Sequence, residues 1–372
     1  MRLNSRIIAA TVSLTPAGLT LATDLPRRFT FIAPCRGPLI ARCQPSSAST
    51  SLSAAHTPAT ASIATMPADS QKMPLWHISH RGGAAEAPEN TLAAFQYAAD
   101  ECKTNMFELD VWQTADKQVV VAHDNNTMRM TGVDCLITAT RFSDLPKTLP
   151  TDQLAPPDDH VDVKTFGGFA RSYPPQPYLL LEDLFKSFPT MPMHIDVKEK
   201  GSRETVVKVI QLVRKYRREH LTFLSSFNDA NVKTVRSLAP EVPVTSPPLR
   251  LLQLMIFYWI GYLPYCNLRE SAISIPLTRH FFEWERKKLF NALHKRIGVF
   301  VAGKIAQWLT GLAYRAMRQK KFIRILKRRG VRVIYWVLNY DEDFQEAFDL
   351  GADGVMTDRP AALRKYLDKR GL

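Results

Sequence analysis

A regular alternation of two patterns constrains the fold of this chain more than any other feature. From residue 75 onward, short runs of β-branched and apolar residues alternate with segments whose apolar residues recur at helical spacing. In residues 203–218, for example, Val206, Val209 and Val213 would share one face of a helix. The predicted strands are residues 75–79, 106–111, 119–123, 193–197, 221–225, 242–245, 272–275, 331–337 and 354–357.

This alternation favours an α/β fold. About eight strand–helix units over ~290 residues predict a (β/α)8 TIM barrel. A doubly wound sheet is the alternative, but no glycine-rich dinucleotide turn follows the first predicted strand. Residues 134–177, which contain Pro and Gly, predict a loop insertion after the second strand. Such an insertion is either surface decoration or a roof over the active site.

The first 70 residues have a different composition from the rest. Residues 43–70 hold eighteen Ser, Thr or Ala, too few apolar side chains to offset the entropy of ordering. We therefore expect a disordered extension over residues 1–70 and a barrel domain over residues 71–372. The leader is rich in Arg, Ser and Thr and poor in acids, which favours an organelle transit peptide. A weak signal peptide or anchor, or a non-native extension ahead of a later start at Met66, stays open.

The net charge of +14 is concentrated in one segment. Residues 279–329 hold fifteen Lys or Arg and only two acids, which indicates an anionic partner but argues against a nucleic-acid groove spread over the fold. Residues 249–265, just before it, are the most apolar stretch, with Tyr258, Trp259 and Tyr262 suited to a membrane interface. We predict that residues 249–329 form an apolar-then-basic membrane-facing segment of an intracellular, membrane-associated protein. The alternative is that they are ordinary outer helices of the barrel.

Carboxylates gather where predicted strands end, which is where barrel enzymes carry their active sites. Glu108 and Asp110 are two residues apart on one strand, so they point to one face, and Asp196 ends another strand. Three carboxylates suit a hard divalent cation, Mg²⁺ or Ca²⁺. The alternative is a structural ion network in which Arg81 and Lys198 neutralise these acids.

Two histidines follow other predicted strands. His80 and His123 could act as general acid and general base in a phosphodiester displacement. Arg81 and Lys198 would then bind the phosphate, Arg by a bidentate fork and Lys as a point charge.

These motifs occur in an order that resembles the glycerophosphodiester phosphodiesterases. The matching motifs are His80-Arg81-Gly82, Pro88-Glu89-Asn90-Thr91, Glu108-x-Asp110, His123-Asp124, Ile195-Asp196-Val197-Lys198, Trp336-Val337-Leu338-Asn339 and Thr357-Asp358-Arg359-Pro360.

The resemblance implies a metal-dependent TIM barrel in which each site residue has a role. Glu108, Asp110 and Asp196 would be metal ligands, and His80 and His123 the acid/base pair. The implied substrate- and phosphate-binding residues are Arg81, Lys198, Trp336 and Asn339. Many members of the family carry Glu at the position of Asp196, so this chain departs from the pattern at one ligand.

The resemblance also implies a reaction. A hydroxyl vicinal to the phosphoester would attack phosphorus, forming a cyclic phosphate that water then opens. The apolar insert between Pro243 and Val331 looks most like the lysophospholipase D branch, which releases choline or ethanolamine and leaves lysophosphatidic acid. Two other hypotheses remain: a glycerophosphodiesterase that gives glycerol 3-phosphate from soluble diesters, and an anionic-lipid-binding protein with little catalysis.

Overall fold

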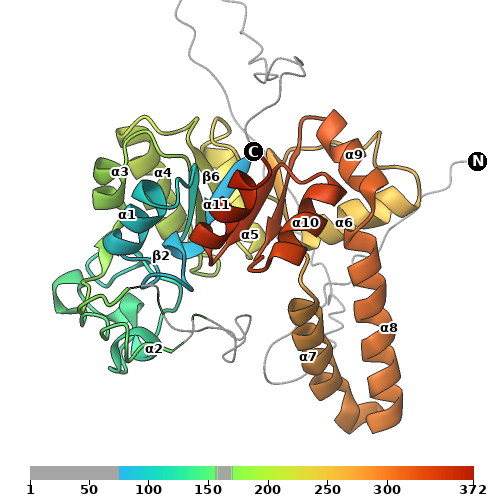
Figure 1. Ribbon diagram of the computed structural model, residues 1–372, viewed down its shortest axis with the longest axis horizontal. Coiled ribbons are helices and arrows are strands. Elements are labelled where there is room, and N and C mark those ends of the chain that lie inside the picture. Colours follow the sequence, from blue (N-terminus) through green and yellow to red (C-terminus); the bar gives the residue numbers. More distant parts are fainter. Residues whose placement is uncertain (1–74, 156, 158–168, 170) are drawn as a thin grey trace, which may run out of the picture. The chain divides into compact units, whose positions relative to one another are not determined.

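The computed structural model describes residues 75–155, 157, 169 and 171–372 (Figure 1). The predicted extension over residues 1–70 lies outside the described residues. Among the described helices, none combines the length and the apolarity that a membrane span needs.

Seven strands run parallel to one another and form the centre of the fold. They are β1 (Trp76–Ser79), β2 (Met106–Gln113), β5 (Met193–Val197), β6 (Thr222–Ser225), β7 (Ala272–Pro276), β8 (Arg332–Trp336) and β9 (Gly354–Thr357). Their order across the sheet is β6-β5-β2-β1-β9-β8-β7, so the first and last strands of the chain are neighbours. All these strands were predicted within one or two residues of their bounds.

The regular strand ladder is open between β6 and β7. Two isolated parallel bridges, Leu224 to Val244 and Thr245 to Ala272, lie in this gap. The strand predicted over 242–245 is present only as these bridges, because Pro243 has no N–H to donate and Pro247 soon ends the run. The predicted eight-stranded barrel is therefore met in part: the parallel α/β arrangement is present, but its ladder is not closed by regular strands.

One predicted strand has a different direction from the others. β3 (Val119–Val121) pairs antiparallel with β2, and the short β4 (Leu179–Leu180) pairs antiparallel with β3. Only residues 114–118 connect β2 to β3, too few for the crossover that a parallel strand requires. The segment predicted as an insertion, residues 134–177, lies between β3 and β4. Its described residues contain two 3-10 turns, Ile137–Ala139 and Phe142–Asp144.

Most of the described helices pack on the outer surface of the sheet. The described helices are α1 (Leu92–Asp100), α2 (Met128–Thr131), α3 (Leu181–Ser187), α4 (Arg203–Lys215), α5 (Asp229–Leu238), α6 (Pro248–Trp259), α7 (Arg279–Ile297), α8 (Val299–Met317), α9 (Lys320–Arg328), α10 (Asp341–Leu350) and α11 (Pro360–Asp368).

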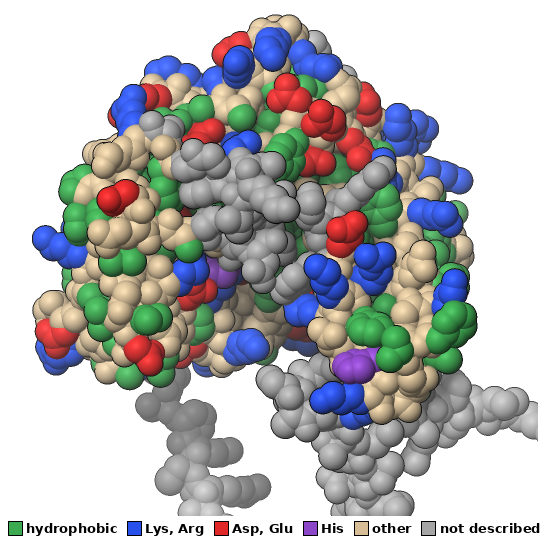
Figure 2. Space-filling view, turned by 60° about the horizontal axis from the view of Figure 1, so that its bottom comes forward, with side chains coloured by type: hydrophobic (Ala, Val, Ile, Leu, Met, Phe, Trp, Pro, Cys, Tyr) green, Lys and Arg blue, Asp and Glu red, His purple; other side chains and the backbone are tan. Residues whose placement is uncertain are grey.

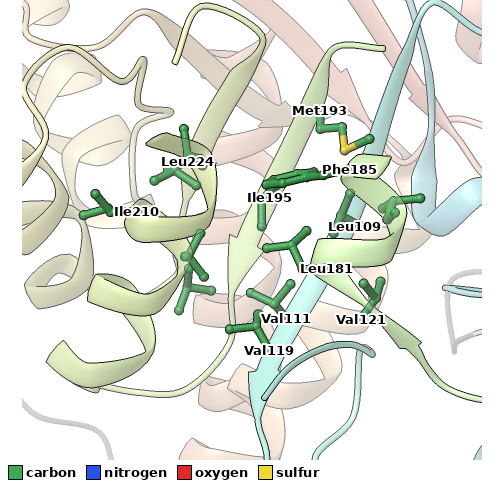
Figure 3. Packing of buried hydrophobic residues seen from close by; sticks show 14 of the residues in the cluster. Leu109, Val111, Val119, Val121, Leu181, Phe185, Met193, Ile195, Ile210 and Leu224 are labelled. Carbon is green, nitrogen blue, oxygen red and sulfur yellow. The ribbon is translucent and has the colours of Figure 1, made fainter. Parts of the chain in front are cut away.

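The predicted face of α4 is buried as expected. Val206, Val209 and Val213 have no exposed surface, and the Ser202 side chain caps the helix by accepting from the Thr205 N–H. Figure 3 shows the cluster that these helices form with outward-facing strand residues such as Leu109 and Ile195. The inward-facing residues of the same strands, which alternate with these, point toward the candidate site.

The apolar-then-basic segment divides into elements with different environments. α6 buries Leu251 and Leu254 but leaves Trp259 half exposed, and α9 buries Phe322 and Leu326, so the alternative of ordinary outer helices holds for α9. α7 and α8 instead pack on each other as a hairpin that projects from the sheet (Figure 1). The apolar side chains Ile305, Trp308, Leu309 and Leu312 of α8 stay exposed there.

Candidate active site

His80 forms the centre of the candidate site with a residue from the far end of the chain. β1 and β9 pair in parallel with Ser79 opposite Thr357, so the residues that follow, His80 and Asp358, meet at the carboxyl end of the sheet. The Nδ1 atom of His80 lies 2.6 Å from Oδ1 of Asp358, and both side chains are buried. A carboxylate at Nδ1 favours the tautomer that carries its proton there, which leaves Nε2 to exchange protons with a substrate.

Electrostatics reinforce this pair. Burial alone would lower the pKa of His80, but the carboxylates of Asp358 and Glu108 outweigh it and raise that pKa above its ordinary value. Burial would likewise raise the pKa of Asp358, but the positive charge of His80 and its hydrogen bond lower it. The pair therefore favours a charged imidazolium beside a carboxylate.

Asn339 holds Asp358 in place. Its Nδ2 donates to Oδ2 of Asp358 over 3.0 Å, and its Oδ1 accepts from the Asp358 N–H and from the Thr357 hydroxyl. Asn339 was predicted as a substrate- or phosphate-binding residue. In the structure the Asn339 amide hydrogen-bonds Asp358, the partner of His80, so Asn339 lies behind that histidine.

Two of the three predicted metal ligands pair with one lysine. β2 and β5 pair with Asp110 opposite Asp196, and Nζ of Lys198 lies 2.9 Å from Asp110 and 2.8 Å from Asp196. These two acids raise the pKa of Lys198 against the opposing effect of burial. Burial and the neighbouring charge of Asp110 raise the pKa of Glu108 to about 7.

This arrangement is one of ion pairs rather than of metal ligands. Three carboxylates have the right chemistry for Mg²⁺ or Ca²⁺, and the Lys198 ammonium pairs with two of them, Asp110 and Asp196. In the part of the chain that the structure describes, no group of three or more His, Cys, Asp or Glu side chains is arranged to hold a metal ion. The donor set suits a divalent ion by its chemistry, although two of its carboxylates are paired with Lys198 here, and the metal stays a prediction.

Arg81 follows His80 and lies among carboxylates. Its backbone N–H donates to Glu108 over 3.1 Å, and its guanidinium approaches Glu89 at 3.4 Å and Asp110 at 3.3 Å. The turn requires Arg81 at φ 53° and Gly82 at φ 82°. A Cβ on Gly82 would lie 2.9 Å from Cβ of Ala94, so glycine is required there.

His123 lies in a second network at the edge of the site. Its Nδ1 lies 2.9 Å from Oδ1 of Asp124. The guanidinium of Arg129 pairs with Asp124 at 2.7 Å and with Glu89 at 2.6 Å, and so connects the two carboxylates. Because Glu89 also approaches Arg81, this network links the β3 hairpin to the turn that carries His80. His123 was predicted at the end of a barrel strand; it reaches the site because the antiparallel β3 runs back along β2.

A row of aromatic side chains begins beside Lys198. The ring of Phe227, which is 63% exposed, lies 5.4 Å from Nζ of Lys198. Trp336 packs edge-on against Phe227 and against Phe281 of α7, with ring centroids 6.2 and 5.6 Å apart. Trp336 was predicted as a substrate-binding residue, and the structure places it in this row, next to the ring of Phe227.

A family model agrees with this geometry. The model described as the Glycerophosphoryl diester phosphodiesterase family matches residues 80–247 and 263–362, which include every residue of the site. The chain belongs to the glycerophosphoryl diester phosphodiesterase family. It is therefore a phosphodiesterase, and the resemblance read from its motifs is confirmed.

Curated relatives point to one branch of the family. The phosphodiesterase is 35% identical to lysophospholipase D GDPD1 of Homo sapiens, over 78% of this chain and 85% of that protein. It is 32% identical to lysophospholipase D GDPD3 of Homo sapiens, over 79% of this chain and 85% of that protein. The similarity to the lysophospholipase D branch is thus confirmed.

Solved structures support the fold. The glycerophosphoryl diester phosphodiesterase domain of a Mycobacterium tuberculosis protein aligns with a TM-score of 0.56 at 16% identity, covering 79% of this chain and 98% of that domain. A glycerophosphoryl diester phosphodiesterase of Silicibacter pomeroyi aligns with a TM-score of 0.53 at 18% identity, covering 80% and 95%. These neighbours show a fold of the TIM-barrel type.

Sequence reasoning missed four residues of the site. Asp358 was quoted in a motif but given no role, and Glu89, Arg129 and Phe227 were not assigned. Phe227 could have been found, because it is an aromatic residue that lies two positions after a predicted strand end.

Proposed function

We propose that this phosphodiesterase acts on lysophospholipids, releasing the head-group alcohol, choline or ethanolamine, and leaving lysophosphatidic acid. The observation that carries the proposal is the contact of Lys198 with the exposed ring of Phe227. A cation beside an exposed aromatic surface suits a substrate that joins a phosphate to an acyl chain. Two human relatives named lysophospholipase D support the same substrate class.

In the proposed mechanism the free hydroxyl of the lysophospholipid glycerol attacks phosphorus. One histidine takes the proton of this hydroxyl as the P–O bond forms, and the other gives a proton to the leaving head-group oxygen as its bond to phosphorus breaks. Water then opens the cyclic phosphate with the two roles reversed. His80 and His123 each have a carboxylate at Nδ1, from Asp358 and Asp124, so each would present Nε2 to the substrate.

Positive charge would stabilise the phosphoryl oxygens. We assign this role to Lys198 and Arg81, whose carboxylate partners also hold them in position. The predicted divalent cation, at Glu108, Asp110 and Asp196, would supply further electrostatic stabilisation when bound.

The substrate preference can be measured directly. Purified full-length protein would be offered lysophosphatidylcholine and glycerophosphocholine side by side, and choline release followed for each. We expect a higher kcat/KM for the lysophospholipid. Preferential release from glycerophosphocholine would replace this proposal by the soluble-diester activity, and no release from either would favour a lipid-binding role.

Substitution of each histidine tests the acid/base assignment. His80→Ala and His123→Ala are expected to lower kcat by a factor on the order of 10²–10⁴ while leaving the fold intact. Undiminished turnover in either purified variant would remove that residue from the mechanism.

A further inference from the structure

The α7–α8 hairpin stands at the same end of the sheet as the candidate site. α7 begins at Arg279, three residues after β7 ends at Pro276, while His80 and Asp358 follow directly on the ends of β1 and β9. The carboxyl ends of parallel strands meet at one edge of a sheet. The two helices extend away from this edge (Figure 1).

The far end of the hairpin exposes large apolar side chains. α7 ends and α8 begins around Gly298, and there Val299 and Phe300 are 65% and 76% exposed. Trp308, two turns further along α8, is 66% exposed. Single exposed apolar side chains are ordinary, but a contiguous set at a projecting tip marks an interaction surface.

The same end is positively charged. No Asp or Glu occurs between Glu285 and Asp341. A groove of about 410 Å³ lies between the two helices, lined by Arg286, Lys287 and Lys304 together with the apolar Val299 and Phe300. Within the described residues, no ion pair joins these three cations to a carboxylate. Figure 2, with this end turned forward, shows blue and green side chains side by side at the lower right, where the hairpin lies.

From these observations we infer that the α7–α8 hairpin docks on an anionic membrane surface, with its groove taking an acidic lipid head group. Cations would meet the lipid phosphates while Phe300 and Trp308 enter the interface. Charge disfavours the other occupants: a second copy would bring the same basic hairpin, and residues 1–70 also carry net positive charge, with six Arg and two acids.

The base of the hairpin connects this surface to the site. Phe281 of α7 packs against Trp336, which packs against Phe227 beside Lys198. If the protein acts on lysophospholipids as proposed above, an acyl chain leaving the membrane would meet an apolar row from the hairpin to the cation. Docking itself does not depend on that proposal.

Vesicle binding tests the inference with full-length protein. Vesicles of phosphatidylcholine alone and vesicles with 30 mol% phosphatidylserine would be compared by co-sedimentation at rising NaCl concentration. We expect binding to the phosphatidylserine vesicles that weakens as salt screens the charges. The triple variant Arg286→Gln, Lys287→Gln, Lys304→Gln should bind on the order of 100-fold more weakly, since each basic residue near an anionic surface contributes roughly a factor of 5.

Matched variants separate docking from net charge and from catalysis. Lys208→Gln, Lys233→Gln, Lys365→Gln removes the same charge from exposed positions on α4, α5 and α11 and should retain binding. Phe300→Ser should weaken binding without changing net charge. All variants should hydrolyse a short-chain lysophosphatidylcholine, dissolved as monomers, at the rate of the unmodified protein.

Two results would overturn the inference. One is equal binding by the hairpin triple variant and its matched control. The other is binding that ignores both salt and phosphatidylserine. Absence of hydrolysis with retained, salt-sensitive binding would instead contradict the proposed function alone, so the two failures are distinguishable.

Discussion

Oδ1 of Asp358 lies 2.6 Å from Nδ1 of His80, although 278 residues separate the two in the sequence. The same carboxylate raises the pKa of His80 against the effect of burial. Asp358 therefore both orients the imidazole and stabilises its charged form.

Replacing Asp358 by Asn should remove both effects. We expect kcat to fall by a factor on the order of 10²–10⁴, because the imidazole loses its fixed tautomer. Since Asp358 raises the pKa of His80, its loss should move the His80 limb of the kcat/KM profile to lower pH. Asp144→Asn, at an exposed acid, is the control. An unchanged pH profile in Asp358→Asn would mean that His80 does not titrate in the reaction.

Arg129 should control the position of His123. Arg129→Ala removes the link between Asp124 and Glu89, and we expect kcat to fall on the order of tenfold. Thermal stability should fall as well, because the buried carboxylate of Glu89 loses its shortest ion pair. Arg129→Lys keeps the charge but not the fork that binds both acids, so it should recover only part of the loss. Full activity in Arg129→Ala would show that the network is structural.

Phe227 should matter only for substrates with an acyl chain. Phe227→Ala is expected to raise KM for a long-chain lysophosphatidylcholine roughly tenfold, because the bound acyl chain would lose its contact with one aromatic ring. KM for glycerophosphocholine, which has no acyl chain, should stay unchanged. Tyr265, which is 79% exposed and precedes the start of β7, offers a matched control as Tyr265→Ala. Equal effects on both substrates would place Phe227 outside the acyl-chain path.

Glu270 should stabilise the fold in a pH-dependent way. Its buried carboxylate pairs with Arg236 of α5 at 2.6 Å and Arg250 of α6 at 3.0 Å. Burial would raise the pKa of Glu270, but the two arginines lower it below its usual 4.5. A lowered pKa means that the stabilisation is present above pH 4.5 and is lost as the pH falls through the folded-state value.

Urea unfolding of Glu270→Gln and the unmodified protein, at pH 7 and below pH 4, tests this prediction. Glu270→Gln should lower the free energy of unfolding by about 2 kcal/mol at pH 7, because two partly buried guanidinium groups lose their charged hydrogen-bond partner. The difference should shrink below pH 4. The exposed pair of Glu241 with Arg214 is the comparison, and Glu241→Gln should cost under about 1 kcal/mol. A Glu270→Gln effect that is the same at both pH values would contradict the ion-pair account.

The predicted metal can be tested by binding as well as by activity. We expect a chelator to lower turnover on the order of 100-fold and Mg²⁺ or Ca²⁺ to restore it. Calorimetry should detect ion binding that Asp196→Asn weakens. Because the Lys198 ammonium competes for Asp110 and Asp196, Lys198→Gln should tighten ion binding on the order of tenfold. A chelator without effect on either measurement would leave the carboxylates only their ion-pair role.

Much of the site could be predicted because its side chains lie at the ends of predicted strands. Glu108, Asp110, Asp196 and Lys198 were read from alternation along two strands, and these strands turn out to be neighbours in register. The role of Asp358 was not predictable from spacing, because only the pairing of the first and last strands brings it to His80.

The sequence pattern alone did not predict the direction of β3 or which of the basic helices would be covered by the rest of the fold. The β-branched run at 119–121 was predicted as a barrel strand, yet the five-residue connection to β2 makes it a hairpin. α8 and α9 are both basic and amphipathic, but α9 buries Phe322 and Leu326 while α8 leaves Trp308 exposed. A helical pattern identifies an apolar face and not what covers it.

The pairing of β1 with β9 has a consequence for when the protein becomes active. Asp358 directly follows β9, so a chain still being synthesised lacks the partner of His80 until β9 has been made, 278 residues after His80. A protein truncated before β9 would keep the carboxylates, Lys198 and both histidines and still lack an oriented imidazole. Efficient hydrolysis is thereby tied to the docking of β9 on β1, and a chain that stopped before β9 would lose the contribution of the oriented imidazole.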